Sequence, residues 1–420
     1  DKYLRILRVE LVPALGCTEP ISIAYAAAKA REVLGVEPDR IIAECSRNVI
    51  KNVMGVIVPT THNMRGIETS AILGAVAGRS DLVLEVLHDV TEKDIERTKE
   101  LLLKKICKVE MLTGGENLRI IMKLYSGDNE VIVEILDNHS NIVRIEKNGE
   151  TLFEANIEDI NNSDFSHYED KDMSINEIYE FATTVDLELI KPIILPQIKN
   201  NCRIAKEGLT NQYGANVGKV LIDSFGTDVK ILAKAYAAAG SDARMSGSVL
   251  PVTICSGSGN QGMTTSLPVI KYAEYLKVSK EKLYRALALS NLIAIRQKIM
   301  IGKLSAYCGA VSAACGSGAA ITYLHDAPLN VIEKTITNTI ANVSGILCDG
   351  AKPSCAAKIA SAVDAAIMGH LMAMKNMSFE SGEGLVKDSI DKTIETFGAI
   401  GREGMRFTDI KILDLMIHDD

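Results

Sequence analysis

The stretch NNSDFSHYEDKDM, residues 161–173, is a polar run that separates two different parts of the chain. Before it, segments 109–114, 118–127, 130–138 and 141–153 alternate apolar and polar residues between Gly and Asn turns, which predicts a meander of strands. After it, Ser174 and Glu177 are spaced as a capping box, and helical periodicity continues to the end. The sequence therefore predicts an α+β fold: an N-terminal α+β domain with an antiparallel sheet, residues 1–165, followed by a mostly α-helical domain, residues 174–420.

Helices are predicted on both sides of this linker. In the first part they start at Pro20 and cover 66–78 and 92–105; in the second they cover 228–239, 268–277, 280–296, 328–343 and 355–375. The uncharged run 306–324 has the length of a membrane span, but it consists mainly of Ala, Gly, Ser and Cys, which contribute little transfer free energy. We expect it to be a buried helix or loop, so no membrane span is predicted.

Length, net charge and the N-terminal sequence limit the kinds of protein that this chain can be. A chain of 420 residues can bury a large interior in each of two domains. A net charge of −8 provides no basic surface for nucleic acid or anionic lipid. The start, DKYLRILRVELVPALG, lacks the basic flank, apolar block and cleavage site of a signal peptide, which favours a cytoplasmic protein.

The nine cysteines should be reduced in the cytoplasm, and six of them lie among turn-forming residues. Cys308 and the two cysteines of CDGAKPSC, Cys348 and Cys355, suit a soft metal centre, for which iron–sulfur and zinc are the choices. The paired CxxC motifs usual for zinc are absent, and three thiolates would leave one iron of a 4Fe-4S cluster open to substrate. Two alternatives remain: inert thiols beside a tight turn, and Cys315 as ligand in place of Cys308.

Residues 255–262, CSGSGNQG, precede a predicted helix and offer free N–H groups, hydroxyls and amides to an anion. Neither the Lys-Ser/Thr of a phosphate loop nor the strand of a dinucleotide fold accompanies them, so a small carboxylate fits better than a nucleotide. A simple Gly-rich turn is the alternative. The predicted substrate-binding residues of this loop are Ser256, Gly257, Ser258, Asn260 and Gln261.

Cys17, in PALGCTEP, lies at the N-terminus of a predicted helix, whose dipole should lower the pKa of its thiol. A thiolate there could act as a base or nucleophile or as a fourth cluster ligand, and a capped thiol without a role is the alternative. Between two predicted helices, residues 46–66 are dense in polar groups that could hold an amino acid or only satisfy turns. From this segment we predict Lys51 and Asn52 as catalytic, and Asn48 and His62 as substrate-binding.

Together these motifs resemble the L-cysteine desulfidase family, relatives of the iron–sulfur L-serine dehydratases. The resemblance rests on PALGCTEP, KNVMGV, SGSGNQGMTTSLPV, IGKLSAYCGA and CDGAKPSC, between residues 13 and 355. It implies a 4Fe-4S cluster on Cys308, Cys348 and Cys355, an active site between the two domains, and no pyridoxal phosphate. Dehydratases carry a histidine where this chain has Cys17, and some have a C-terminal cysteine that this chain lacks. His139, in DNHSN, is interpreted as a turn residue without a role.

The resemblance implies a lyase that converts L-cysteine to pyruvate, ammonia and sulfide. We expect the open iron to act as a Lewis acid on the leaving sulfur, the 256–262 loop to hold the carboxylate, and Cys17 to take the α-proton. The alternatives are an L-serine dehydratase with the same cluster, a non-catalytic iron–sulfur sensor, and a protein built around zinc. L-cysteine is the expected partner, and a homodimer is left open.

Overall fold

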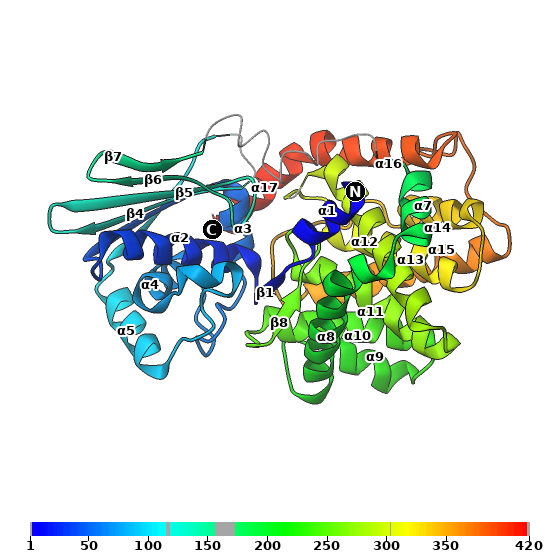
Figure 1. Ribbon diagram of the computed structural model, residues 1–420, viewed down its shortest axis with the longest axis horizontal. Coiled ribbons are helices and arrows are strands. Elements are labelled where there is room, and N and C mark those ends of the chain that lie inside the picture. The colour runs from blue at the N-terminus through cyan, green and yellow to red at the C-terminus, as the bar shows by residue number, and fades with distance from the viewer. Residues whose placement is uncertain (1, 115–117, 156–172, 303, 418–420) are drawn as a thin grey trace.

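The computed structural model describes residues 2–114, 118–155, 173–302 and 304–417, and the linker 161–173 lies outside them except for Met173. The described chain is an α+β protein with a mixed sheet in its N-terminal part and a helical C-terminal part, as predicted (Figure 1). The linker that was to divide the domains is thus almost entirely outside the described residues, and the division at residues 165 and 174 stays a prediction.

The N-terminal part contains most of the strands. Its helices are α1 (Lys2–Glu10), α2 (Thr18–Leu34), α3 (Arg47–Met54), α4 (Ile67–Ala77), the 3-10 segment η1 (Ser80–Glu85) and α5 (Glu92–Leu103). Its strands are β1 (Pro13–Leu15), β2 (Arg40–Cys45), β3 (Cys107–Met111), β4 (Arg119–Ser126), β5 (Asn129–Leu136), β6 (Ile142–Lys147) and β7 (Glu150–Glu154).

The six-stranded sheet has the order β3-β2-β4-β5-β6-β7, in which β2 and β3 are parallel and the other pairs antiparallel. The meander β4 to β7 matches the prediction. Strand β2 was not predicted, and its insertion between β3 and β4 makes the sheet mixed instead of antiparallel. Six residues of alternating burial between two helices were too short to stand out as a strand. Helix α2 packs on β4 and β5, and α4 packs on α2 (Figure 1).

The described residues of the C-terminal part form a helical bundle with one short strand. Its elements are α7 (Ile175–Thr184), α8 (Leu187–Thr210), α9 (Val217–Phe225), α10 (Val229–Met245), β8 (Pro251–Thr253), α11 (Gly259–Leu276), α12 (Lys280–Ile301), α13 (Gly309–Leu324), α14 (Leu329–Asn342), α15 (Cys355–Met374), α16 (Ile390–Ala399), the π-helical segment η3 (Ile400–Gly404) and α17 (Arg406–Ile417). Helix α13, from the uncharged 306–324 run, packs against α11, α12, α14 and α15. Its small residues allow this close approach, as expected for a buried helix.

Helix α15 is long and apolar enough to cross a membrane by length and composition, and no other helix in the described part of the chain is. Of its most apolar window, 56% is buried inside the protein, as in the core helix of a globular protein. This is weak evidence for a membrane span.

Both ends of the chain cross between the two parts (Figure 1). Helix α1 packs on α8 and α12, and its Leu7 is fully buried in the core of the helical part. Helix α17 packs on α3, and its Leu413 is buried in the core under the sheet. Strand β1 pairs with β8, with Pro13 opposite Thr253, which places the segments that follow each strand next to each other.

Candidate active site

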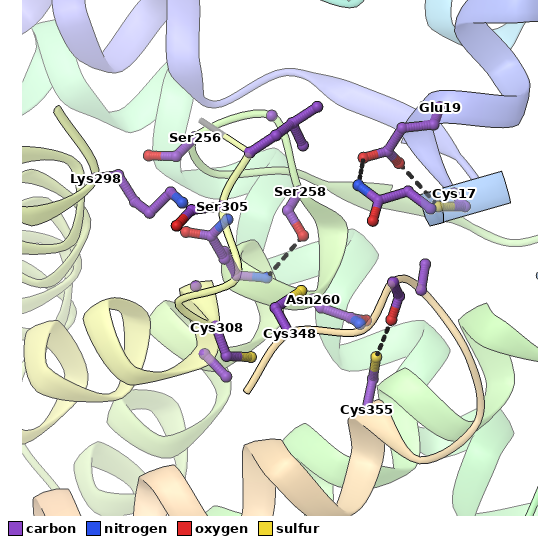
Figure 2. Close-up of a pocket in the computed structure, with 18 of the residues that line it drawn as sticks. Cys17, Glu19, Ser256, Ser258, Asn260, Lys298, Ser305, Cys308, Cys348 and Cys355 are labelled. Atoms are coloured by element: carbon purple, nitrogen blue, oxygen red, sulfur yellow. Dashed lines mark hydrogen bonds between the residues drawn. The ribbon is translucent and has the colours of Figure 1, made fainter. Parts of the chain in front are cut away.

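Both parts of the chain contribute to one cavity of about 100 Å³. From the N-terminal part come residues at the start of α2, on α3 and in the loop between β5 and β6. From the helical part come the segment around the start of α11, the approach to α13 and the 348–355 loop. Its lining includes Cys17, Glu19, Asn52, His139, Arg244, Ser256, Gly257, Ser258, Asn260, Gln261, Lys298, Ser305, Tyr307, Cys308, Cys348, Gly350 and Cys355 (Figure 2).

The three predicted metal ligands all line this cavity. Cys308 is the N-cap of α13, and Cys355 is the first residue of α15. Two backbone hydrogen bonds join the approach to α13 with the start of the 348–355 loop, from Cys308 N to Ile346 O at 2.9 Å and from Cys348 N to Ala306 O at 2.7 Å. The fold therefore brings thiols 40 residues apart in sequence into one wall.

The 348–355 loop lies directly against α3. Gly350 has a φ of 92°, and a Cβ atom there would lie 2.4 Å from the backbone oxygen of Lys51. Only glycine satisfies both conditions. The Asp349 carboxylate pairs with the ammonium groups of Lys352 and Lys358, which fixes the loop from the other side.

The electrostatics of the thiols favour negative charge at Cys348. Its pKa is lowered, first by a hydrogen bond from Cys308 and then by the ammonium groups of Lys51 and Lys298, against the effect of burial. The same hydrogen bond and burial raise the pKa of Cys308. One thiolate in this wall is therefore stabilised by the protein alone.

The three thiols are a donor set that suits an iron–sulfur cluster. No three His, Cys, Asp or Glu side chains in the described ranges are grouped to hold one metal ion. A 4Fe-4S cluster carries its thiolates on different irons, so thiols spread around a cavity wall suit it. Two of the three lie at helix N-termini, where the dipole favours the negative charge of such a group.

Cys17 faces the same cavity as the N-cap of α2 (Figure 2). The prediction of a lowered pKa is wrong for this thiol. Burial, followed by the nearby Glu19 carboxylate, raises the pKa of Cys17 well above its ordinary value, and the opposing effect of Arg244 is smaller. The Cys17 thiol donates a hydrogen bond to Oε2 of Glu19 at 3.1 Å. The helix dipole is outweighed because Cys17 is only 1% exposed and its thiol lies beside an acid.

Glu19 is buried and accepts several hydrogen bonds. From the sequence it was recognised only as an acid in the first turn of a helix. Besides Cys17, it accepts hydrogen bonds from the Thr18 hydroxyl at 3.1 Å and from Nδ2 of Asn52 at 2.9 Å. Nε2 of His139 lies 3.7 Å from Oε1. Burial opposes ionisation of Glu19, but its contacts with His139 and Cys17 outweigh burial and lower its pKa.

His139 is a second residue whose place was not predicted. Its side chain is buried, its backbone oxygen accepts a hydrogen bond from the Ser22 hydroxyl at 2.6 Å, and its ring faces Gly257. A Cβ atom at Gly257, which has a φ of 74°, would lie 3.1 Å from the ring. His139 lies between two strands, and nothing in its sequence neighbourhood indicated a binding site. Most residues of the cavity are more than 100 positions away from it in the sequence.

The five predicted residues of the 256–262 loop all line the cavity. Helix α11 begins earlier than predicted, at Gly259, with Ser258 as its N-cap, so two of the five lie in the first helical turn. Several buried polar atoms of this cavity have no hydrogen-bond partner among the described residues: Asn52 Oδ1, His139 Nε2, Asn260 Oδ1 and Gln261 Oε1. Buried polar groups are usually paired, so these atoms are suited to receive a polar ligand.

Three of the predicted residues from segment 46–66 are not in the cavity lining. Asn48 is buried on α3, and the Lys51 ammonium pairs with Asp409 of α17. The imidazole of His62 is 65% exposed and lies 2.8 Å from Glu92, at a separate cavity of about 380 Å³. Only Asn52 of this group reaches the site.

Cys315 does not line the cavity, whereas Arg244 and Lys298 do. Cys315, the alternative ligand, is buried inside α13, where its thiol contacts the backbone oxygen of Ile336 at 3.8 Å. Arg244 and Lys298 are buried at the cavity although neither stood out in the sequence. Arg244 donates from Nε to the backbone oxygen of Gly16 at 2.8 Å, which ties α10 to the approach to α2.

Comparison with known proteins places the chain among relatives that match it from end to end. Residues 81–414 match the family model described as serine dehydratase alpha chain. UPF0597 proteins are similar over 99% of the chain: that of Lachnoclostridium phytofermentans is 55% identical with 99% of its own length covered, that of Desulfitobacterium hafniense 50% with 96%, and that of Finegoldia magna 48% with 99%.

Proposed function

Because the chain belongs to the serine dehydratase alpha chain family, which suggests an iron–sulfur lyase, we propose that it eliminates the β-substituent of a small amino acid. The proposed substrate is L-cysteine, and the products are pyruvate, ammonia and sulfide. We place this reaction in the cytoplasm and without pyridoxal phosphate. The observation that carries the proposal is one cavity in which three thiols face hydroxyl, amide and imidazole groups.

Cys308, Cys348 and Cys355 would hold a 4Fe-4S cluster. When bound by three protein thiolates, such a cluster supplies Lewis-acid help to the group that leaves from Cβ. The remaining requirements of the reaction, which are substrate binding and removal of the α-proton, fall to side chains of the chain itself.

The start of α11 and Arg244 are suited to the substrate carboxylate. Free N–H groups at a helix N-terminus and a buried guanidinium both favour an anion. The unpartnered amide oxygens of Asn52, Asn260 and Gln261 are suited to the ammonium group. Both charged ends of a small amino acid would then be held in the same cavity, with its side chain free to face the thiols.

His139, supported by Glu19, is the group best suited to take the α-proton. An imidazole can accept a proton near neutral pH, and an adjacent carboxylate stabilises the imidazolium that results. Cys17 is less suited, because its thiol is protonated when burial and Glu19 raise its pKa. We propose instead that Cys17 orients the Glu19 carboxylate through the hydrogen bond that its thiol donates. Loss of the α-proton and of hydrosulfide leaves 2-aminoacrylate, which tautomerises and adds water to give pyruvate and ammonia.

L-serine is the second candidate substrate, and the description of the matched family favours it. The same residues would act, and water would leave in place of hydrogen sulfide. Anaerobic purification with iron and sulfide quantitation, followed by pyruvate assays with L-cysteine and L-serine, tests both. We expect about four irons per chain and a higher kcat/KM for L-cysteine. A higher kcat/KM for L-serine would make L-serine the substrate in place of L-cysteine. A purified protein without iron would overturn the proposal.

A further inference from the structure

We propose that Asp242, Ser246 and the turn at Gly214 form a binding site for a monovalent cation beneath the 348–355 loop. The site lies outside the lining of the cavity described above. It is formed where the C-terminal end of α10 meets the turn that precedes α9, two helices that pack together (Figure 1).

Asp242 is fully buried in the last turn of α10. Its Oδ2 atom accepts a hydrogen bond from the backbone N–H of Gly218 at 3.0 Å, so this oxygen satisfies the N-terminus of α9. The other carboxylate oxygen, Oδ1, is buried and has no hydrogen-bond partner among the described residues. The hydroxyl oxygen of Ser246, one turn further along the chain, is also buried and has no hydrogen-bond partner among the described residues.

These two oxygens face a common space next to Gly214. Gly214 has a φ of 54°, and a Cβ atom built on it would lie 3.0 Å from Ser246 Oγ and 3.7 Å from Asp242 Oδ1. The same point lies 3.3 Å from Cβ of Pro353, in the loop that carries Cys348 and Cys355. A carboxylate oxygen and a hydroxyl oxygen therefore converge at the underside of this loop.

The charge of this space favours a cation. Asp242 has no ion-pair partner in the part of the chain that the structure describes, so backbone N–H groups at the start of α9 compensate its buried charge only in part. Burial accordingly raises the pKa of Asp242 to about 6. The C-terminal end of α10, with 17 residues, adds the negative end of a helix dipole.

The ligand set argues for a single positive charge. Oxygen atoms are the ligands of hard cations, and calcium sites commonly gather several carboxylates. Here one carboxylate and one neutral hydroxyl meet, which balances the charge of K⁺ or Na⁺. A cation bound at this point would connect α10 and the Gly214 turn to Pro353 and so restrict the loop that holds two of the three thiols.

Thermal unfolding of the anaerobically purified protein tests the site without any assay of lyase activity. We expect Tm to rise by about 1–1.5 °C for a tenfold increase in KCl or NaCl, with N-methylglucamine chloride keeping the ionic strength constant. Asp242→Asn retains an oxygen for the Gly218 N–H but removes the charge, so this cation dependence should be lost. Asp223→Asn, at an exposed acid of α9, is the matched control and should behave as the wild type.

Equal Tm values in all three salts would overturn the proposal and assign the site to a proton or a water molecule. Cation dependence that persists in Asp242→Asn would also overturn it. If Asp242→Asn does not fold, Ser246→Ala should weaken the dependence, and a Tl⁺ soak of wild-type crystals should give an anomalous peak next to Gly214. Absence of that peak at saturating Tl⁺ contradicts the site. None of these results depends on which amino acid is the substrate.

Discussion

Nε2 of His139 lies 3.7 Å from Oε1 of Glu19, and both side chains are buried in the wall of the cavity that contains the three thiols. The pair joins a loop of the sheet to the start of α2, and Gly257 of the helical part packs against the imidazole. The acid–base pair thus lies within the N-terminal part, and the helical part covers its imidazole through Gly257.

His139→Asn should lower kcat by about 10²–10⁴-fold, the usual contribution of a general base. Iron content should not change, because His139 is not among the proposed ligands. Steady-state pyruvate production and iron quantitation on the same sample check this. His62→Asn is the matched control: its side chain is exposed and outside the cavity, so its kcat should match the wild type. Equal losses in both variants would contradict the role of His139.

Cys17→Ser should retain iron and lose no more than about tenfold in kcat, which corresponds to about 1.4 kcal/mol. The serine hydroxyl can still donate a hydrogen bond to Glu19, as the thiol does now. Iron analysis and steady-state kinetics measure both effects. If kcat falls as far as in His139→Asn, Cys17 is the base, and if iron is lost, Cys17 is a ligand.

Cys348→Ser and Cys355→Ser should each abolish the iron–sulfur absorption of the anaerobically purified protein. A serine hydroxyl is a poor substitute for a thiolate toward iron. Cys202→Ser, a half-buried cysteine of α8 outside the cavity, is the control that should keep the full spectrum. An unchanged spectrum in either test variant would remove that cysteine from the ligand set.

Glu19→Gln should reduce the stability of the fold near pH 7 by about 1.5–3 kcal/mol, the usual contribution of hydrogen bonds to a charged group. The pKa of Glu19 is lowered in the folded protein, so its ionised form stabilises the fold above the ordinary pKa of 4.5. This contribution is lost as pH falls from that value through the folded pKa. Urea unfolding at several pH values should show a weaker acid dependence in the variant; parallel curves would contradict the assignment.

Lys51→Met should destabilise the protein by about 2 kcal/mol, because it leaves the Asp409 carboxylate without its partner. The Asp409 side chain is 18% exposed, so water offsets part of the loss. Urea unfolding of Lys51→Met, Asp409→Asn and the double variant measures the coupling. If the double variant equals the sum of the singles, the contact contributes nothing to stability.

The sequence predicted what local patterns determine. Alternation predicted the meander β4 to β7, and periodicity predicted long helices such as α5, α12 and α15. Turn residues around cysteines singled out Cys308, Cys348 and Cys355, which line one cavity, and their role as ligands stays a prediction. The mixed sheet was not predicted because β2 pairs with a strand that begins more than 60 residues later. The pKa of Cys17 was predicted in the wrong direction because a helix terminus is visible in the sequence, whereas burial next to Glu19 is a property of the folded chain.

The site residues that were missed share one cause. His139 and Arg244 come from segments with no unusual composition, and their position depends on contacts such as the pairing of β1 with β8 and the bond from Arg244 to Gly16. His62 was instead wrongly included, because its polar neighbours in the sequence suggested a binding site. In the fold, that neighbourhood faces a different cavity.

The exchange of terminal helices between the two parts has a consequence for anyone who would express them separately. Cutting the chain in the 161–173 region would give two fragments. The sheet fragment would lack Leu413 and the bundle fragment would lack Leu7, so each would expose apolar core residues to water. Co-expressed fragments should instead assemble as a complementing pair, in which each half supplies the missing helix of the other.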